Sequence, residues 1–373
     1  MHLLIFIHSM RDGGAERVSA NLANYWAGKG WQVTLVTLVS KDDDVYELSP
    51  LINRISLNSA DVSSNALAGL VNNIRRVIRL RQILRQIQPD LAMGMMTTAN
   101  VLLAMAAWGV SIHTVGVEHI HPPRLPMGFL WETLRRYTYG LLNVVTALAS
   151  EGEEWIKSNT NAKKVLVIPN SVHWPLTTED PQINPNTTYP LDKKLLLAVG
   201  RLNTQKGFDW LIEGFYSLAH KHPNWVLVIL GEGSLRPLLE KQVFESKLEN
   251  CIFLPGRAGN INEWYEKANL FVMSSRFEGF PMTLVEAMAY GLPAVSFDCD
   301  TGPRDIIRHE IDGLLVRPGN VAELTAALDR LMSDDLLIER FSKRAAEVRE
   351  RFSRERIVAM WEKLFEDVLH ENK

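Results

Sequence analysis

The sequence predicts an α/β protein with two domains, each built on a doubly wound parallel sheet. The chain has 373 residues, which is more than one hydrophobic core usually serves, so two domains are expected. Short apolar runs alternate with helical patterns on both sides of a single proline-rich stretch. This alternation is typical of parallel strands that are joined by helices.

The first domain is expected over residues 1–175. Its strands are predicted where β-branched and other apolar residues gather in short runs, at residues 3–8, 32–38, 90–95, 112–117, 144–149 and 164–169. Residues 173–192 contain four prolines and show neither a strand nor a helical period. We therefore expect an interdomain linker there.

The second domain is expected over residues 176–352. The alternation resumes with predicted strands at residues 194–199, 225–230, 270–274 and 293–297. A last helix is predicted over about 353–373. Its apolar positions recur at helical spacing, so it must pack on another surface: Ile357, Met360, Trp361, Leu364 and Val368.

Composition excludes several classes of protein. With 46% hydrophobic and 22% charged residues, disorder is not expected. The longest apolar run, residues 101–110, is half the length of a membrane span, and the opening segment becomes polar too early for a secretory signal. We therefore expect a cytoplasmic protein. The two cysteines fit a reducing compartment and make only a weak case for zinc.

Residues 62–89 lack acidic residues and are rich in arginine. The arginines are Arg75, Arg76, Arg79, Arg81 and Arg85. Such a local positive field attracts phosphates or an anionic membrane. Two interpretations stay open: a helix that packs on the sheet with solvated arginines, or a helix at a membrane surface that contacts anionic lipid or a lipid pyrophosphate.

Three motifs follow predicted strands, where ligands of open α/β sheets usually bind. Gly13 and Gly14 come after the first strand and allow a tight turn into a helix whose free N–H groups can bind an anion. A glycine turn without a ligand is the alternative. The spacing is not the GxGxxG pattern of dinucleotide-binding proteins, which disfavours a nicotinamide cofactor.

The second motif places two cations, Arg201 and Lys206, after the strand at 194–199. Such pairs are usually solvated surface residues. At about 4 Å from a diphosphate, however, each could contribute ~4 kcal/mol at an effective dielectric near 20, before desolvation. These two cations could stabilise a departing nucleotide without a metal.

The third motif contains two glutamates, Glu278 and Glu286, around a predicted helix at 281–290. Pro281 suits the first helical position, and Gly291 suits the end. The helix start directs free N–H groups at a phosphate. Glu278 could then reach a sugar, and Glu286 could accept hydrogen bonds from a ribose diol.

Taken together, five elements make the sequence resemble the retaining glycosyltransferases of family 4. They are GGAER at 13–17, EH at 118–119, GRLNTQKG at 200–207, FLPGR at 253–257, and the E-x7-E of Glu278 and Glu286. The resemblance implies the GT-B fold, in which two Rossmann-like, doubly wound domains face each other across a cleft. It also implies that the final helix packs back on the first domain.

The resemblance further implies a role for each motif residue. Arg201 and Lys206 would bind the donor's diphosphate, Glu286 the ribose, and the backbone near Arg257 the base. Glu278 would hold hydroxyls of the transferred sugar, and His119 would lie beside the reacting centre. The residues expected to approach the distal phosphate are Gly14, Gly279, Phe280, Pro281, Met282 and Thr283. No cofactor or metal is expected, and the DCD at 298–300 is discounted as a metal motif.

The acceptor is assigned to the first domain. Residues 121–142 combine aromatic residues with Arg124 and two further arginines, and they suit an acceptor lid. The motifs and the basic helix resemble bacterial transferases that extend polyprenyl-diphosphate-linked oligosaccharides, including the type that adds N-acetylgalactosamine. That resemblance implies a lipid-linked glycan acceptor. The donor is expected to be a hexose or N-acetylhexosamine on UDP. Of the two interpretations of the basic helix, we favour attachment to the inner face of the membrane through Arg75, Arg79, Arg81 and Arg85.

Other functions stay open at this point. A soluble transferase, or a sugar-nucleotide epimerase of the same fold, would use a substrate that is not lipid-linked. A non-catalytic module that binds sugar nucleotides is a third possibility. No nucleic acid partner is expected.

Overall fold

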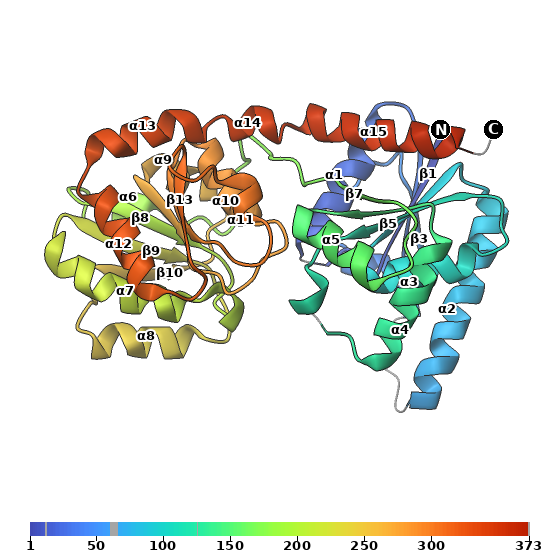
Figure 1. Ribbon diagram of the computed structural model, residues 1–373, viewed down its shortest axis with the longest axis horizontal. Helices are drawn as coiled ribbons and strands as arrows, with labels where there is room; N and C mark the ends of the chain where they lie inside the picture. Colours follow the sequence, from blue (N-terminus) through green and yellow to red (C-terminus); the bar gives the residue numbers. More distant parts are fainter. Residues whose placement is uncertain (12, 60–65, 125, 372–373) are drawn as a thin grey trace. The chain divides into compact units, whose positions relative to one another are not determined.

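The computed structural model describes residues 1–11, 13–59, 66–124 and 126–371. They form two compact units (Figure 1). The first comprises Met1–Pro169 and Ile357–Lys373, and the second comprises Asn170–Arg356. Each unit contains one sheet of parallel strands flanked by helices. The predicted α/β class with two parallel sheets is therefore confirmed.

The sheet of the first unit has seven strands in the order β3-β2-β1-β4-β5-β6-β7. Their bounds are β1 His2–Ile7, β2 Gln32–Thr37, β3 Asn53–Ser56, β4 Leu91–Met95, β5 His113–Glu118, β6 Val144–Ala147 and β7 Val165–Val167. The strand order reverses between β1 and β4. Ligands of open α/β sheets usually bind beside such a reversal, at the carboxyl ends of the strands.

The helices of the first unit cover both faces of this sheet. Their bounds are α1 Gly14–Gly28, η1 Lys41–Asp43, α2 Ala66–Ile87, α3 Thr97–Ala107, η2 Pro122–Arg124, α4 Phe129–Thr138, η3 Tyr139–Leu141, α5 Ser150–Asn159 and α15 Arg354–His370. α1 and α15 pack on one face, while α2 and α3 pack on the other. No helix of the described residues is both long and apolar enough to cross a bilayer.

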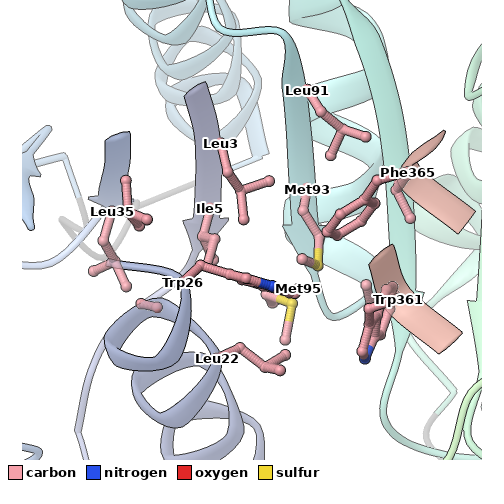
Figure 2. Packing of buried hydrophobic residues seen from close by; sticks show 14 of the residues in the cluster. Leu3, Ile5, Leu22, Trp26, Leu35, Leu91, Met93, Met95, Trp361 and Phe365 are labelled. Carbon is pink, nitrogen blue, oxygen red and sulfur yellow. The ribbon is translucent and has the colours of Figure 1, made fainter. Parts of the chain in front are cut away.

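The last helix, α15, completes the core of the first unit. Figure 2 shows Trp361 and Phe365 of α15 and Trp26 of α1 beside the strand residues Ile5 and Met93, in one cluster of buried side chains. The ring centroids of Trp26 and Phe365 are 5.3 Å apart. These side chains are almost fully buried, and truncating one such aromatic residue typically costs ~3–5 kcal/mol. The apolar stripe of the last helix therefore belongs to this core.

The sheet of the second unit has six strands in the order β10-β9-β8-β11-β12-β13. Its strands are β8 Lys194–Val199, β9 Trp225–Leu230, β10 Ile252–Gly256, β11 Leu270–Met273, β12 Ala294–Phe297 and β13 Gly313–Val316. Its helices are α6 Pro185–Thr188, η4 Thr204–Lys206, α7 Phe208–Lys221, α8 Arg236–Glu245, α9 Ile261–Lys267, α10 Met282–Ala289, α11 Pro303–Ile306, α12 Val321–Met332, α13 Asp335–Ala345 and α14 Val348–Arg351. β8 and β11 are neighbours, so the loops that follow them lie at the same edge.

The proline-rich stretch at 173–192 belongs to the second unit and is not a linker between the two units. Glu179 N donates to Gly259 O at 3.0 Å, and Trp264 Nε1 donates to Ile183 O at 3.1 Å. These contacts hold the stretch against α9 and the residues just before it. The stretch is therefore fixed by bonds to other segments and needs no regular pattern of apolar residues. The first unit ends at Pro169 rather than at residue 175, and the second extends to Arg356.

Candidate functional site

Two loops at the carboxyl edge of the second sheet carry most of the predicted donor residues. The loop after β8 turns at Asn203, whose side chain accepts a hydrogen bond from Lys206 N at 3.3 Å. Gly207 ends that turn with φ +63°, a left-handed conformation that favours glycine. A Cβ on Gly207 would lie 2.1 Å from Ser274 O. Glycine is therefore required where this loop meets the loop after β11.

Lys206 and Glu278 form a buried ion pair at this edge. Lys206 Nζ donates to Glu278 Oε1 at 2.6 Å, and Ser275 Oγ donates to the same oxygen at 2.6 Å. Glu278 is 6% exposed. No described residue donates to Glu278 Oε2. Sequence reasoning treated Lys206 and Glu278 as separate ligand contacts and missed both this pairing and the contribution of Ser275.

Arg201 differs from Lys206. Its side chain is exposed just after β8, and none of the residues that the structure describes accepts a hydrogen bond from its guanidinium. The structure therefore leaves the donor groups of Arg201 available to a ligand. Arg257 is also exposed, just beyond β10, which β9 and β8 separate from β11 in the sheet.

The start of α10 is held by the loop after β12. α10 begins at Met282, with Pro281 as its N-cap at φ −73° and ψ 97°, so the expectation of Pro281 at the first helical position is wrong by one residue. Phe280 is buried against Phe352, with ring centroids 5.3 Å apart. Thr301 Oγ1 donates to Glu278 O, and a Cβ on Gly302 would lie 2.9 Å from Gly279 O. The segment 279–281 is therefore closely supported.

Glu286 lies inside α10 and is buried. The Tyr265 hydroxyl of α9 lies 3.4 Å from Glu286 Oε2 and 3.3 Å from Thr283 O, and its single hydrogen can be donated to either acceptor. Tyr265 is itself almost fully buried, so it limits the rotamers open to Glu286. The spacing of the two glutamates gave no sign of this tyrosine.

His119 follows β5 in the first unit. It is 8% exposed, and its Nε2 has no hydrogen-bond partner among the described residues. Burial lowers the pKa of His119 to about 4, so the imidazole is neutral at pH 7. A buried polar atom without a partner is uncommon in folded proteins. This unpaired buried nitrogen favours a functional role for His119.

Glu118, the residue before His119, is the centre of a buried polar cluster that sequence reasoning left without a role. Thr97 Oγ1 lies 2.9 Å from both carboxylate oxygens, and Tyr139 donates its hydroxyl to Oε1. Asn100 Nδ2 lies 3.3 Å from the Tyr139 hydroxyl and donates to Val117 O at 3.0 Å. Burial raises the pKa of Glu118. A glutamate that ends an otherwise apolar strand is the sequence signal that could have revealed it.

At the start of α1, the described residues impose no strong steric constraint on either glycine. A Cβ on Gly13 would meet only the carboxyl end of the flexible Glu16 side chain, and a Cβ on Gly14 would meet nothing within 4 Å. Gly13 N lies 3.2 Å from the Tyr46 hydroxyl, which in turn donates to Gly13 O at 2.9 Å. The space beside Gly14 is open, as the approach of a ligand to its backbone would require.

The arginines of α2 have two different roles. Arg79 donates to Leu57 O at 2.9 Å, and Arg81 donates to Ala106 O at 3.1 Å and to Trp108 O at 2.6 Å. These two hold α2 to the rest of the unit, so not all four arginines form a free basic face. Arg75 and Arg85 are exposed. Residues 62–65 of the acid-free segment lie outside the described residues.

Exposed apolar side chains lie on α2 and α4. On α2 they recur at helical spacing: Leu70, Val71, Ile74 and Ile78. α4 exposes Leu130, Tyr137 and Phe129, which is 88% exposed. Arg124, the last residue of η2, is exposed near the start of α4. We define the apolar face of α2 by its four residues and use that name below.

The DCD segment has a local explanation. Arg304 donates from Nε to Asp298 Oδ1 at 2.8 Å and from its NH2 nitrogen to Asp298 Oδ2 at 3.0 Å. Within the described ranges, no group of three His, Cys, Asp or Glu side chains is placed to hold a metal ion. Both carboxylate oxygens of Asp298 therefore accept hydrogen bonds from Arg304.

Comparison with known proteins assigns both units to glycosyltransferases. Residues 12–173 match the family model described as "Glycosyltransferase Family 4", and residues 179–348 match the one described as "Glycosyl transferases group 1". Together the two matches span most of the chain.

Two curated relatives cover nearly the whole chain. The amylovoran biosynthesis glycosyltransferase AmsD of Erwinia amylovora is 28% identical over 364 residues, covering 96% of this chain and 98% of AmsD. An α-1,4-N-acetyl-D-galactosaminyltransferase of Campylobacter jejuni, named for a diphosphoundecaprenol-linked acceptor, is 24% identical over 369 residues and 99% of each chain. Among solved structures, Anabaena Alr3699/HepE in complex with UDP has a TM-score of 0.76 at 18% identity, over 99% of each chain. That likeness shows the fold.

Proposed function

The chain belongs to family 4 of the glycosyltransferases, with the GT-B fold, and from this premise we propose that it moves a hexose or N-acetylhexosamine from a nucleotide sugar to a glycan on a polyprenyl diphosphate. UDP is the proposed nucleotide, since the Anabaena structure of the same fold binds UDP. The observation that carries the proposal is the buried pair of Lys206 and Glu278.

The second unit would bind the donor's diphosphate. An ammonium has three donor hydrogens, and Glu278 Oε1 takes one from Lys206, so the others can reach phosphate oxygens. Arg201 adds a second, exposed cation. At about 4 Å each cation contributes ~4 kcal/mol at an effective dielectric near 20. Backbone N–H groups of Gly279, Phe280, Met282 and Thr283, around the start of α10, would hold the distal phosphate, so that no metal is required.

The remaining donor contacts follow from the same edge. Glu286, oriented by Tyr265, would accept hydrogen bonds from the ribose hydroxyls. The backbone beside Arg257 would contact the base. In the first unit, the open space beside Gly14 would allow its backbone to approach the distal phosphate.

Glu278 and His119 would bind the transferred sugar. Glu278 Oε1 already accepts from Lys206 and Ser275, which directs Oε2 to the sugar hydroxyls. The neutral imidazole of His119 offers Nε2 beside the reacting centre. In a reaction that retains the anomeric configuration, the acceptor hydroxyl would attack the face that the nucleotide leaves, and the nucleotide phosphate would take its proton. The protein would contribute positioning and charge stabilisation.

The first unit would bind the lipid-linked acceptor at the cytoplasmic face of an anionic membrane. The apolar face of α2 is exposed beside Arg75 and Arg85. Each such arginine near an anionic surface contributes about 1 kcal/mol. Phe129 and Tyr137 of α4, together with Arg124, would contact the acceptor. The name of the Campylobacter jejuni relative supports a lipid-linked acceptor.

A transfer assay tests this function. The purified chain is incubated with a panel of UDP- and GDP-sugars and either a synthetic polyprenyl-diphosphate glycan or the same glycan without its lipid, and the donors and products are separated by chromatography and measured by mass spectrometry. We expect a mass gain of one or more sugars with at least one UDP-sugar. Transfer only to a water-soluble acceptor, or only epimerised donor, would replace the lipid-linked assignment, and an absence of product with every donor would favour a binding module.

Flotation with anionic vesicles tests the membrane assignment separately. Ile74→Asn with Ile78→Asn should abolish co-flotation. A matched control changes two exposed apolar residues of α8, Leu238→Asn and Phe244→Asn, and should float like the wild type. Equal flotation of all three proteins would exclude the apolar face of α2 as the membrane contact.

A further inference from the structure

We propose that Arg276 is a positioning residue for the donor site, because it clamps the turn that carries Lys206 to the loop that carries Glu278. The inference rests on the proposed function, which assigns Lys206 and Glu278 to the nucleotide sugar. Arg276 lies two residues before Glu278, in the loop after β11. Its side chain reaches the other loop.

The guanidinium of Arg276 bonds to both sides of the Lys206 turn. One terminal nitrogen donates to Thr204 O at 2.7 Å and to Asp209 Oδ1 at 2.9 Å, and the other donates to Asp209 Oδ2 at 2.6 Å. Thr204 and Asp209 lie on either side of Lys206 in the chain. A fork of this kind fixes direction as well as distance. The turn is therefore held at two points by one planar group.

Stacking connects the clamp to the core of the second unit. The Arg276 guanidinium lies 3.8 Å from the centroid of the Trp210 ring. Trp210 packs edge-on against Phe297 of β12, with ring centroids 5.7 Å apart, and Phe297 is fully buried. Because the indole is held by the core, the guanidinium that stacks on it is held as well.

Further hydrogen bonds bring the same two loops together. Arg276 N donates to Gln205 O at 2.7 Å, Gln205 Nε2 donates to Phe277 O at 3.0 Å, and Ser274 Oγ donates to Lys206 O at 2.9 Å. These bonds join the two loops beside Lys206. The Arg276 side chain extends the junction to Thr204 and Asp209 and so restrains the whole turn.

The effect on a ligand is geometric, because the charge of Arg276 is already matched by Asp209. Although burial acts to raise the pKa of Asp209, the hydrogen bonds and charge of Arg276 lower it overall. Because the turn is held in one conformation, Lys206 Nζ is already placed 2.6 Å from Glu278 Oε1. A preformed arrangement of this kind avoids an ordering cost on binding.

The test compares Arg276→Ala and Arg276→Lys with the wild-type full chain. Calorimetry measures the Kd of UDP, and hydrogen exchange of the ligand-free protein measures opening of residues 203–207 and 274–279. Arg276→Ala should raise the Kd about tenfold, because the turn must then be ordered when the ligand binds, and should speed exchange in both loops. For Arg276→Ala, millimolar guanidinium chloride, but not sodium chloride, should restore part of the UDP affinity and part of the protection from exchange in the two loops. Lysine lacks the planar fork, so Arg276→Lys should bind nearly as weakly as Arg276→Ala.

Arg330→Ala is the matched control. Arg330 of α12 donates in a similar way to both carboxylate oxygens of Glu310, at 2.5 and 2.8 Å. The Arg330→Ala variant should leave the Kd of UDP and hydrogen exchange in the two loops unchanged. Unchanged UDP affinity in Arg276→Ala overturns the inference, as does a loss of melting temperature alone. If the wild type binds no UDP or other nucleoside diphosphate, the proposed function fails, and unchanged loop exchange in Arg276→Ala would then overturn the clamp independently.

Discussion

The polar groups that follow β8 and β11 in the second unit and β5 in the first unit are organised in opposite ways. In the second unit, Lys206 and Glu278 are charged and paired, and two neighbouring loops hold them in place. In the first unit, His119 is neutral and its Nε2 is unpaired among the described residues. The paired charges suit a charged ligand such as a diphosphate, whereas the neutral imidazole suits hydroxyl groups.

The first unit also contains a buried carboxylate, that of Glu118, but it is not paired with His119. The carboxylate of Glu118, next to His119, is turned to the Thr97 and Tyr139 hydroxyls. Glu118 is the last residue of β5, whereas His119 lies just beyond the strand and makes no bond to this cluster through Nε2. Glu118 therefore contributes to the packing of α3, while His119 remains available to a ligand.

Breaking the Lys206–Glu278 pair should have the largest effect. Lys206→Met and Glu278→Gln should each reduce turnover at least about a hundredfold, because each removes a preorganised group at the reacting sugar or the leaving diphosphate. The measurement is kcat with the best donor from the transfer assay.

Stability separates the function of that pair from its structural role. Lys206→Met leaves the Glu278 carboxylate buried without its cation, and the cost should be ~3 kcal/mol. The double variant should recover part of that stability but none of the turnover. Near-normal rates in both single variants would reject the assignment of this pair to catalysis.

The neutral state of His119 should appear as a pH dependence of stability. In the unfolded chain its pKa is about 6.5, whereas in the folded chain it is about 4. Between these values the unfolded state binds the extra proton, so stability is complete above about pH 6.5 and is lost as pH falls towards 4. The loss should be about 2–3 kcal/mol.

Urea unfolding of the wild type and of His119→Phe from pH 7 to pH 4 measures this contribution. Phenylalanine does not titrate, so the variant should lose less stability than the wild type over that range. Parallel curves for the two proteins would show that His119 is not a buried neutral group.

The smallest effect is expected from the polar cluster around Glu118. Tyr139→Phe removes one hydroxyl from the carboxylate and should lower the free energy of unfolding by about 1–3 kcal/mol, with a smaller effect on kcat. Tyr137→Phe, at an exposed position in the same region, is the control and should be neutral by urea unfolding. If Tyr139→Phe lowers kcat by more, in free-energy terms, than it lowers the free energy of unfolding, the cluster has a role in catalysis as well as in packing.

Local patterns predicted the strands more securely than the contacts between loops. The apolar run at 194–199 corresponds to β8 (Lys194–Val199), because a strand buried on both faces must be apolar throughout. The linker prediction at 173–192 was wrong because prolines and polar residues mark irregular structure wherever it lies. The arginines of α2 look alike in sequence, yet Arg79 and Arg81 bond to carbonyls that only the folded unit brings within reach.

The assigned roles of the site residues remain predictions, although the structure defines how several of those residues are held. Ser275, Tyr265 and Arg276 were not predicted, since each acts through a partner on another element. Neither the periodicity of apolar residues nor the spacing of motif residues in the sequence indicates a partner on another element.

The sequence by itself determined the two-sheet α/β architecture, the position of the motifs after strands and the apolar stripe of the last helix. These follow from side-chain periodicity and turn residues, which are local properties. Only the tertiary structure decided that Lys206 meets Glu278, 72 residues away, and that His119 is left neutral and unpaired. The order of strands in the sheet sets those contacts, because it places β8 beside β11 and buries the end of β5.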